Sequence, residues 1–134
     1  MNRTKARENA FILLFEKSIK SEETYEEIFN KATEIRELEC DDYVKQVFFG
    51  CAENAQIIDE TVSSALVGWN KNRVSYVSRA ILNLAAYELM FMEDIPGRVS
   101  INEAVELSKK YDDEKAYGFV NGVLNAIADS VGKK

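Results

Sequence analysis

Few side chains in this sequence could perform acid–base or nucleophilic catalysis. The chain contains no histidine, so the most common general base is missing, and neither a Ser-His-Asp nor a Cys-His arrangement can form. Pairs of adjacent carboxylates remain, such as Asp41-Asp42 and Asp112-Asp113. Carboxylates that are neighbours in the chain seldom converge on one substrate, and such pairs also occur in solvated turns and helix starts. We therefore expect a protein that is not an enzyme, and keep a small acidic enzyme as an alternative.

The two cysteines are the other candidates for chemistry. Cys40 and Cys51 lie eleven positions apart, which along one helix is a rise of roughly 16 Å. This exceeds the Cα separation of about 7 Å that a disulfide tolerates, and free thiols are typical of an intracellular protein. A structural zinc site normally uses cysteine and histidine ligands, and the chain has neither a histidine nor a Cys-x-x-Cys pair. We therefore expect no metal, no cofactor and a cytoplasmic location.

Charge is distributed unevenly along the chain. The net charge of −6, taken as a sum, argues against a nucleic-acid partner. Residues 1–7 nevertheless carry only cations, Arg3, Lys5 and Arg7, whereas residues 21–42 are strongly acidic. The acids of that segment are Glu22, Glu23, Glu26, Glu27, Glu34, Glu37, Glu39, Asp41 and Asp42. The pattern by itself fits two interpretations, namely ordinary solvated helix faces or a small cationic contact surface beside an anionic segment.

Length and composition predict a single globular helical domain. A chain of 134 residues can form one domain, or two small helical halves that share an interface. Hydrophobic residues make up 46% and charged residues 30% of the chain, which disfavours disorder. No apolar stretch reaches the length of a membrane span, and the polar start of the chain does not resemble a signal peptide. We place the N-terminal half at about residues 1–70 and the C-terminal half at about residues 71–134.

Hydrophobic periodicity in the N-terminal half predicts three helices. The first covers residues 4–19, and a second starts at the capping box formed by residues 24–27. The third has the clearest pattern, because its apolar residues recur at alternating steps of four and three, as in a heptad seam. These residues are Val44, Phe48, Cys51, Ala55, Ile58, Val62 and Ala65. We interpret the seam as packing within the chain rather than as an intermolecular coiled coil, and expect the helix to end at residues 68–70.

The C-terminal half predicts three more helices. Between residues 80 and 92 only Asn83 and Glu88 interrupt an apolar run, and they do not form one wet face, so this helix should be buried on nearly every side. Residues 95–97 then form a turn around a proline. A second capping box at residues 100–103 is expected to open the next helix. The last helix is expected at about residues 114–131.

Three segments of this half resemble the NusB family. They are SRAILNLAAYEL at 78–89, SINEAVELSKKY at 100–111 and FVNGVLNAIA at 119–128, and they occur in the family's order, with Ile95-Pro96 between the first two. The N-terminal half is similar more loosely, through residues 3–15 and through Gly50 and Asp59. The resemblance implies an all-α fold of six to seven helices in two three-helix bundles.

The resemblance also implies a function. NusB-type proteins pair with the small-subunit ribosomal protein NusE, and the pair binds the boxA segment of ribosomal RNA leader transcripts within the RNA polymerase antitermination complex. We therefore expect a cytoplasmic, RNA-binding transcription antitermination factor that is a monomer or weak homodimer and has no membrane partner. The alternative is a protein-interaction module of the same fold without significant RNA binding.

The family's contact residues correspond to six positions of this chain. Its basic N-terminus corresponds to Arg3, Lys5 and Arg7, which would contact phosphates, and the start of its final motif corresponds to Phe119. An aromatic ring there could stack on an unpaired base or belong to the core. For the protein partner the resemblance indicates Phe15 and Ser78, although Phe15 could instead complete the core. Two departures from the family, a basic N-terminus interrupted by Thr4 and Ala6 and an alanine at position 65 where some members carry an aromatic, predict weak RNA binding by the protein alone.

Overall fold

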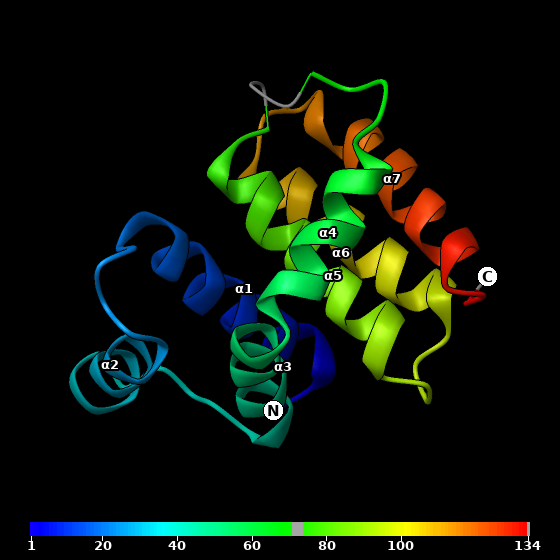
Figure 1. Ribbon diagram of the computed structural model, residues 1–134. Coiled ribbons are helices and arrows are strands. Elements are labelled where there is room, and N and C mark those ends of the chain that lie inside the picture. Colours follow the sequence, from blue (N-terminus) through cyan, green and yellow to red (C-terminus); the bar gives the residue numbers. More distant parts are fainter. Residues whose placement is uncertain (71–73, 134) are drawn as a thin grey trace.

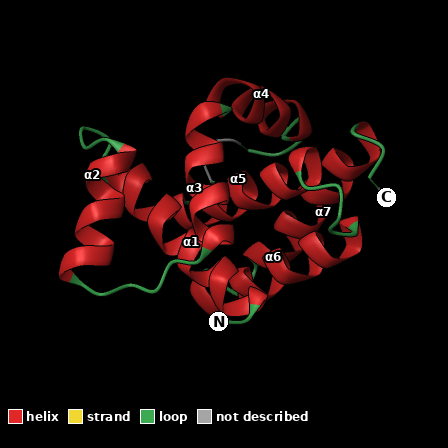
Figure 2. Cartoon of the chain, turned by 90° about the horizontal axis from the view of Figure 1, so that it is seen from below, coloured by secondary structure: helices red, strands yellow, loops and turns green. Residues whose placement is uncertain are grey.

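Every regular element in the part of the chain that the computed structural model describes, residues 1–70 and 74–133, is a helix (Figure 1, Figure 2). A short π-helical turn, η1 (Lys31–Ile35), continues α2. The α-helices of these residues are α1 (Arg3–Ile19), α2 (Tyr25–Asn30), α3 (Asp42–Glu53), α4 (Ala55–Ala65), α5 (Tyr76–Phe91), α6 (Gly97–Tyr111) and α7 (Ala116–Ser130). The predicted all-α class with six to seven helices is confirmed.

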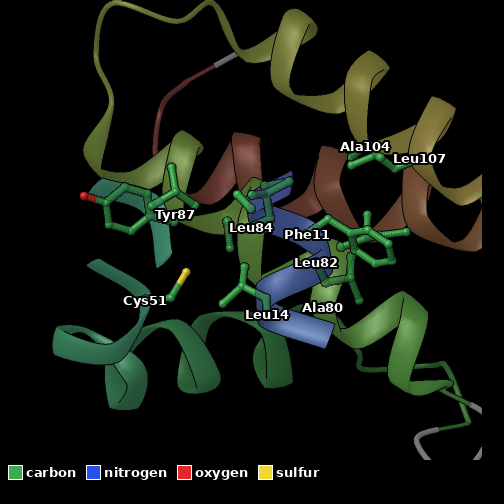
Figure 3. Close-up of a cluster of buried hydrophobic side chains, with 14 of the residues drawn as sticks. Phe11, Leu14, Cys51, Ala80, Leu82, Leu84, Tyr87, Ala104 and Leu107 are labelled. Atoms are coloured by element: carbon green, nitrogen blue, oxygen red, sulfur yellow. The ribbon is translucent and has the colours of Figure 1, made fainter. Parts of the chain in front are cut away.

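Helix α5 is the central element of the fold. It packs against α1, α3, α4, α6 and α7, and its predicted burial on nearly every side is confirmed, with Asn83 half-buried. Figure 3 shows Leu84 of α5 near Phe11 and Leu14 of α1. One continuous cluster of buried hydrophobic side chains includes residues from α1 to α7. The two predicted halves therefore share a core, as expected for the single domain that we propose.

Local capping explains where the first two helices begin. The Asn2 side chain accepts a hydrogen bond of 2.8 Å from the Lys5 amide, so α1 starts at residue 3, one position before the predicted start. At α2, the Thr24 hydroxyl accepts from the Glu27 amide and the Glu27 carboxylate accepts from the Thr24 amide, both at 3.0 Å. The predicted capping box is confirmed, and each such cap stabilises a helix start by about 1 kcal/mol.

The predicted continuous third helix is wrong at its middle. The chain forms two helices, α3 and α4, which meet at Asn54. The Asn54 side chain donates to the Gly50 carbonyl at 2.9 Å, and such local side-chain bonds compete with a regular helix. As a result Ala55 is exposed, whereas Cys51 before the break and Ile58 after it are buried. The heptad spacing therefore holds on each side of the break. Ala55, which was expected at the centre of the seam, lies in solvent.

The second predicted capping box is also wrong. Helix α6 begins at Gly97, directly after Pro96, so Ser100 and Glu103 lie within the helix, and their side chains bind other helices. A Cβ atom on Gly97 would lie 2.1 Å from the carbonyl oxygen of Lys133, because the C-terminal end of the chain passes over this turn. A glycine is therefore required at this position, and the helix starts directly after Pro96, one turn before the predicted Ser-Glu pair.

The predicted last helix and the predicted free cysteines agree with the structure. Helix α7 covers residues 116–130, close to the predicted 114–131, and Gly132 follows it with a φ of +69°, as is common at helix ends. Cys40 and Cys51 are both free. No helix in the two described ranges is long and apolar enough to cross a membrane.

Candidate functional site

Arg7 is part of the core and not of the surface. Its side chain is only 5% exposed, with Nε 2.7 Å from Glu88 Oε2 and Nη1 2.9 Å from Glu103 Oε1. Burial disfavours the charged guanidinium, but the hydrogen bond to Glu88 and the charge of that carboxylate raise the pKa of Arg7. Removing one partner of such a buried pair typically costs about 3–5 kcal/mol. The expectation that Arg7 contacts phosphate therefore does not fit the structure.

Glu88 is the centre of the network that holds Arg7. Besides the guanidinium, its carboxylate accepts hydrogen bonds from the Tyr43 hydroxyl and, at 2.7 Å, from the Ser100 hydroxyl. Burial and the nearby Glu88 charge raise the pKa of Tyr43 far above its ordinary value, so the phenol stays protonated and donates. The network thereby joins α1, α3, α5 and α6. Its role is to fix how these four helices sit relative to one another.

Arg3 and Lys5, in contrast, remain available at the surface. The Arg3 guanidinium lies over the Tyr43 ring at 4.5 Å from its centroid, and both residues are exposed. Lys5 Nζ is 2.9 Å from Glu8 Oε1. Glu8 also accepts from Lys110 and from the Tyr111 hydroxyl, and the hydrogen bonds of Lys110, Lys5 and Tyr111 lower its pKa to about 2. The negative charge of Glu8 is thus matched by two lysines.

Phe119 lies on the wall of a groove together with Trp69. The two rings are nearly perpendicular, at 75°, with centroids 4.9 Å apart. The indole also lies against Gly122, where a Cβ atom would be 3.4 Å from the ring, so a side chain at that position would press on it. Phe119 is half-buried and Trp69 is 45% exposed. Phe119 therefore packs against a neighbour and still has accessible surface, which is compatible with both interpretations.

The groove has a volume of about 490 Å³. Its wall includes the loop after α4, the start of α5, the turn between α6 and α7, and the start of α7. The residues that line it are Trp69, Asn70, Val74, Ser75, Ser78, Asp112, Asp113, Lys115, Ala116 and Phe119. Trp69 was not among the expected site residues. The sequence offered one signal, because an aromatic that directly follows a glycine at a helix end often lies outside the helix. In the structure Gly68 has a φ of +90°.

Ser78 does not lie on an open surface. Its side chain is buried, and its hydroxyl donates to the Asp112 carboxylate at 2.5 Å, as the Ser75 hydroxyl does at 2.9 Å. Ser75 also caps α5 by accepting from the Ser78 amide. The expectation that Ser78 contacts a protein partner directly therefore does not fit. Its observed role is to tie the start of α5 to the end of α6 beneath the groove.

Phe15 is half-buried and belongs to a row of aromatic rings. Its ring centroid is 6.1 Å from that of Phe11, which in turn is 4.9 Å from that of Tyr111 at the end of α6. It packs against the core and keeps part of its surface accessible. The structure therefore brings Ser78 and Phe119 together in one groove, whereas Phe15 lies on the middle of α1.

A helical protein with accessible cations at one helix start and an aromatic groove at another belongs to the class of binding proteins. Residues 4–129 match the family model of the NusB family. The transcription antitermination protein NusB of Clostridium perfringens (strain SM101 / Type A) is 43% identical over 98% of this chain and 99% of its own length. The chain therefore belongs to the NusB family of transcription antitermination proteins, which are not enzymes.

Solved structures agree with this assignment. NusB from T. maritima superposes with a TM-score of 0.82 at 36% identity, covering 96% of this chain and 92% of that one. A second structure contains the antitermination factors NusB and NusE in complex with double-stranded RNA, and its matching chain has a TM-score of 0.82 at 34% identity, with 96% of each chain covered. The expected family and the expected non-enzymatic class are confirmed.

Proposed function

We propose that this protein is a cytoplasmic transcription antitermination factor that pairs with the ribosomal protein NusE and binds boxA-type RNA of ribosomal RNA leader transcripts, as part of the RNA polymerase antitermination complex. The observation that carries the proposal is the groove of Trp69 and Phe119, which offers accessible aromatic surface on a protein of this family. The structural relative that is bound to NusE and RNA supports it.

Two kinds of contact would hold the RNA. Arg3 and Lys5 would neutralise phosphates, and Phe119 with Trp69 would stack on unpaired bases, at about 1–3 kcal/mol per base. We leave Arg7 out of the proposed phosphate contacts because its side chain is buried. Asp112 and Asp113 line the same groove and would repel phosphate, so the groove itself is suited to a base rather than to the backbone. Ser78 would contribute only by holding the groove in shape.

The acidic character of the protein bears on the partner. With a net charge of −6, long-range repulsion weakens the approach of RNA, so affinity should be low for the protein alone, which we propose is a monomer or weak homodimer. A basic ribosomal protein would supply positive surface. The accessible part of Phe15 is the position that we propose for contact with it, since an aromatic edge in water gains most from being covered.

The test uses the single tryptophan of the chain as its probe. A boxA-type single-stranded RNA is titrated into the protein, with and without NusE, while Trp69 fluorescence and RNA anisotropy are recorded. We expect tighter binding with NusE, quenching of Trp69 on binding, and weaker binding for Phe119→Ala with an unchanged salt dependence. If NusE binds but no RNA affinity appears in its presence, the RNA role is lost and the protein is an interaction module.

A further inference from the structure

We propose that Lys109 and Lys110, in the last turn of α6, contact the RNA backbone and extend the cationic surface of α1 along α6. This inference rests on the RNA-binding function proposed above. It concerns residues of the α6 motif that are exposed in the structure, and it gives the protein a second pair of phosphate contacts where the buried Arg7 provides none.

The position of Lys110 links it to α1. Its ammonium group binds Glu8, the carboxylate that also binds Lys5. Lys5 and Lys110 therefore lie on either side of one carboxylate, and both line a hollow of about 270 Å³ between the start of α1 and α6. Figure 2 shows the N-terminal end of the chain beside α6. The hollow is also lined by Glu103 and Glu106, so the proposed phosphate contacts are with the exposed ammonium groups of the two lysines and not with the hollow itself.

The position of Lys109 links it to α7. Its ammonium group lies 5.0 Å from the centroid of the Tyr117 ring, and Tyr117 lies in the first turn of α7. Lys115, a cation of the turn before α7, lines the aromatic groove itself. Lys109 therefore extends the cations of α1 and Lys110 towards the first turn of α7.

Exposure and charge favour phosphate as the occupant. The side chains of Lys109 and Lys110 are 51% and 62% exposed, whereas Glu8 beneath them is only 11% exposed. Lys109 has only a loose ion pair, at 4.0 Å from Glu106. Asp112, the nearest acid after the two lysines, is held by Ser75 and Ser78 on the groove side. The Lys109 ammonium group can therefore reach an anion without breaking a tight ion pair, whereas that of Lys110 would share its charge between the anion and Glu8.

The experiment measures the affinity of the protein–NusE complex for a labelled boxA-type RNA over a salt series. We expect Lys109→Gln/Lys110→Gln to weaken binding at low salt and to flatten the plot of log affinity against log salt by about 0.7 for each lost single-strand phosphate contact, or about 1.4 for both. Lys109→Arg/Lys110→Arg keeps the charge and should keep the slope. The matched control is Lys20→Gln at the far end of α1, because Lys20 also pairs with a glutamate of its own helix.

The outcomes separate the two proposals. If the wild-type complex binds RNA and the double Gln variant has the same slope and affinity, the lysine contacts are refuted and the RNA-binding function stands. If the wild-type complex binds no RNA, both are refuted. Lys109→Gln alone guards against a folding defect, since Lys109 has no tight ion pair, and it should still lower the slope by about 0.7. Equal losses for Lys20→Gln would show a general charge effect and overturn the assignment to α6.

Discussion

Replacing Arg7 by methionine should destabilise the protein strongly, although the residue lies in a segment that looks like a surface cluster of cations. Methionine keeps much of the side-chain length but removes the bonds to Glu88 and Glu103. The buried Glu88 carboxylate would keep only Tyr43 and Ser100 as donors. Leaving one charge of a buried pair alone costs about 3–5 kcal/mol, a large part of a total stability of roughly 5–15 kcal/mol.

Urea unfolding followed by circular dichroism measures this loss, and Arg3→Gln is the matched control. Arg3 is exposed and stacks on Tyr43, so its loss should cost about 1 kcal/mol or less. In the double variant Arg7→Met/Glu88→Gln the uncompensated charge is gone, and part of the stability should return. A loss below about 1 kcal/mol for Arg7→Met would refute the assignment of Arg7 to the core and would return it to the candidate phosphate contacts.

Three further predictions test the fold. Gly50→Ala should destabilise by about 1–3 kcal/mol in thermal or urea unfolding, because its Cβ would lie 2.4 Å from the Tyr87 ring; unchanged stability would show that α3 can move away. Ala55→Glu should cost less than about 0.5 kcal/mol, whereas Ile58→Asp should unfold the protein; equal effects would restore the continuous seam. Because the pKa of Glu8 is lowered to about 2, its contribution to stability is complete above its unfolded pKa of about 4.3 and is lost as the pH falls towards 2. Glu8→Gln should therefore flatten the pH dependence of stability between those values, and an unchanged profile would contradict the ion pairs.

Most of the helices could be predicted because their signals are local. The capping box at Thr24 needs only four consecutive residues, and the apolar run of α5 needs only its own composition. The break at Asn54 could not be read from the seam, because the apolar spacing continues through it and the cause is one side-chain bond to Gly50. The start of α6 was missed because the Ser100–Glu103 spacing matches a capping box, whereas both side chains bind other helices. The need for glycine at position 97 could not be predicted either, since it comes from Lys133 at the other end of the chain.

The candidate site was harder to predict than the fold, and Arg7 explains why. Its spacing from Arg3 places both residues on one helix face, but the sequence does not say what covers that face near residue 7. The cover is made by Tyr43, Glu88 and Ser100 from three other helices. One signal was available, because a single glutamate inside the apolar α5 run requires a cationic partner once it is buried. Lys110 is the opposite case: nothing local marks it as a neighbour of Lys5, and only the packing of α6 against α1 places both lysines on Glu8. Tertiary packing therefore places Arg7, a member of the expected cationic cluster, in the core. It also places Lys110, which was not expected there, at the edge of that cluster beside Lys5.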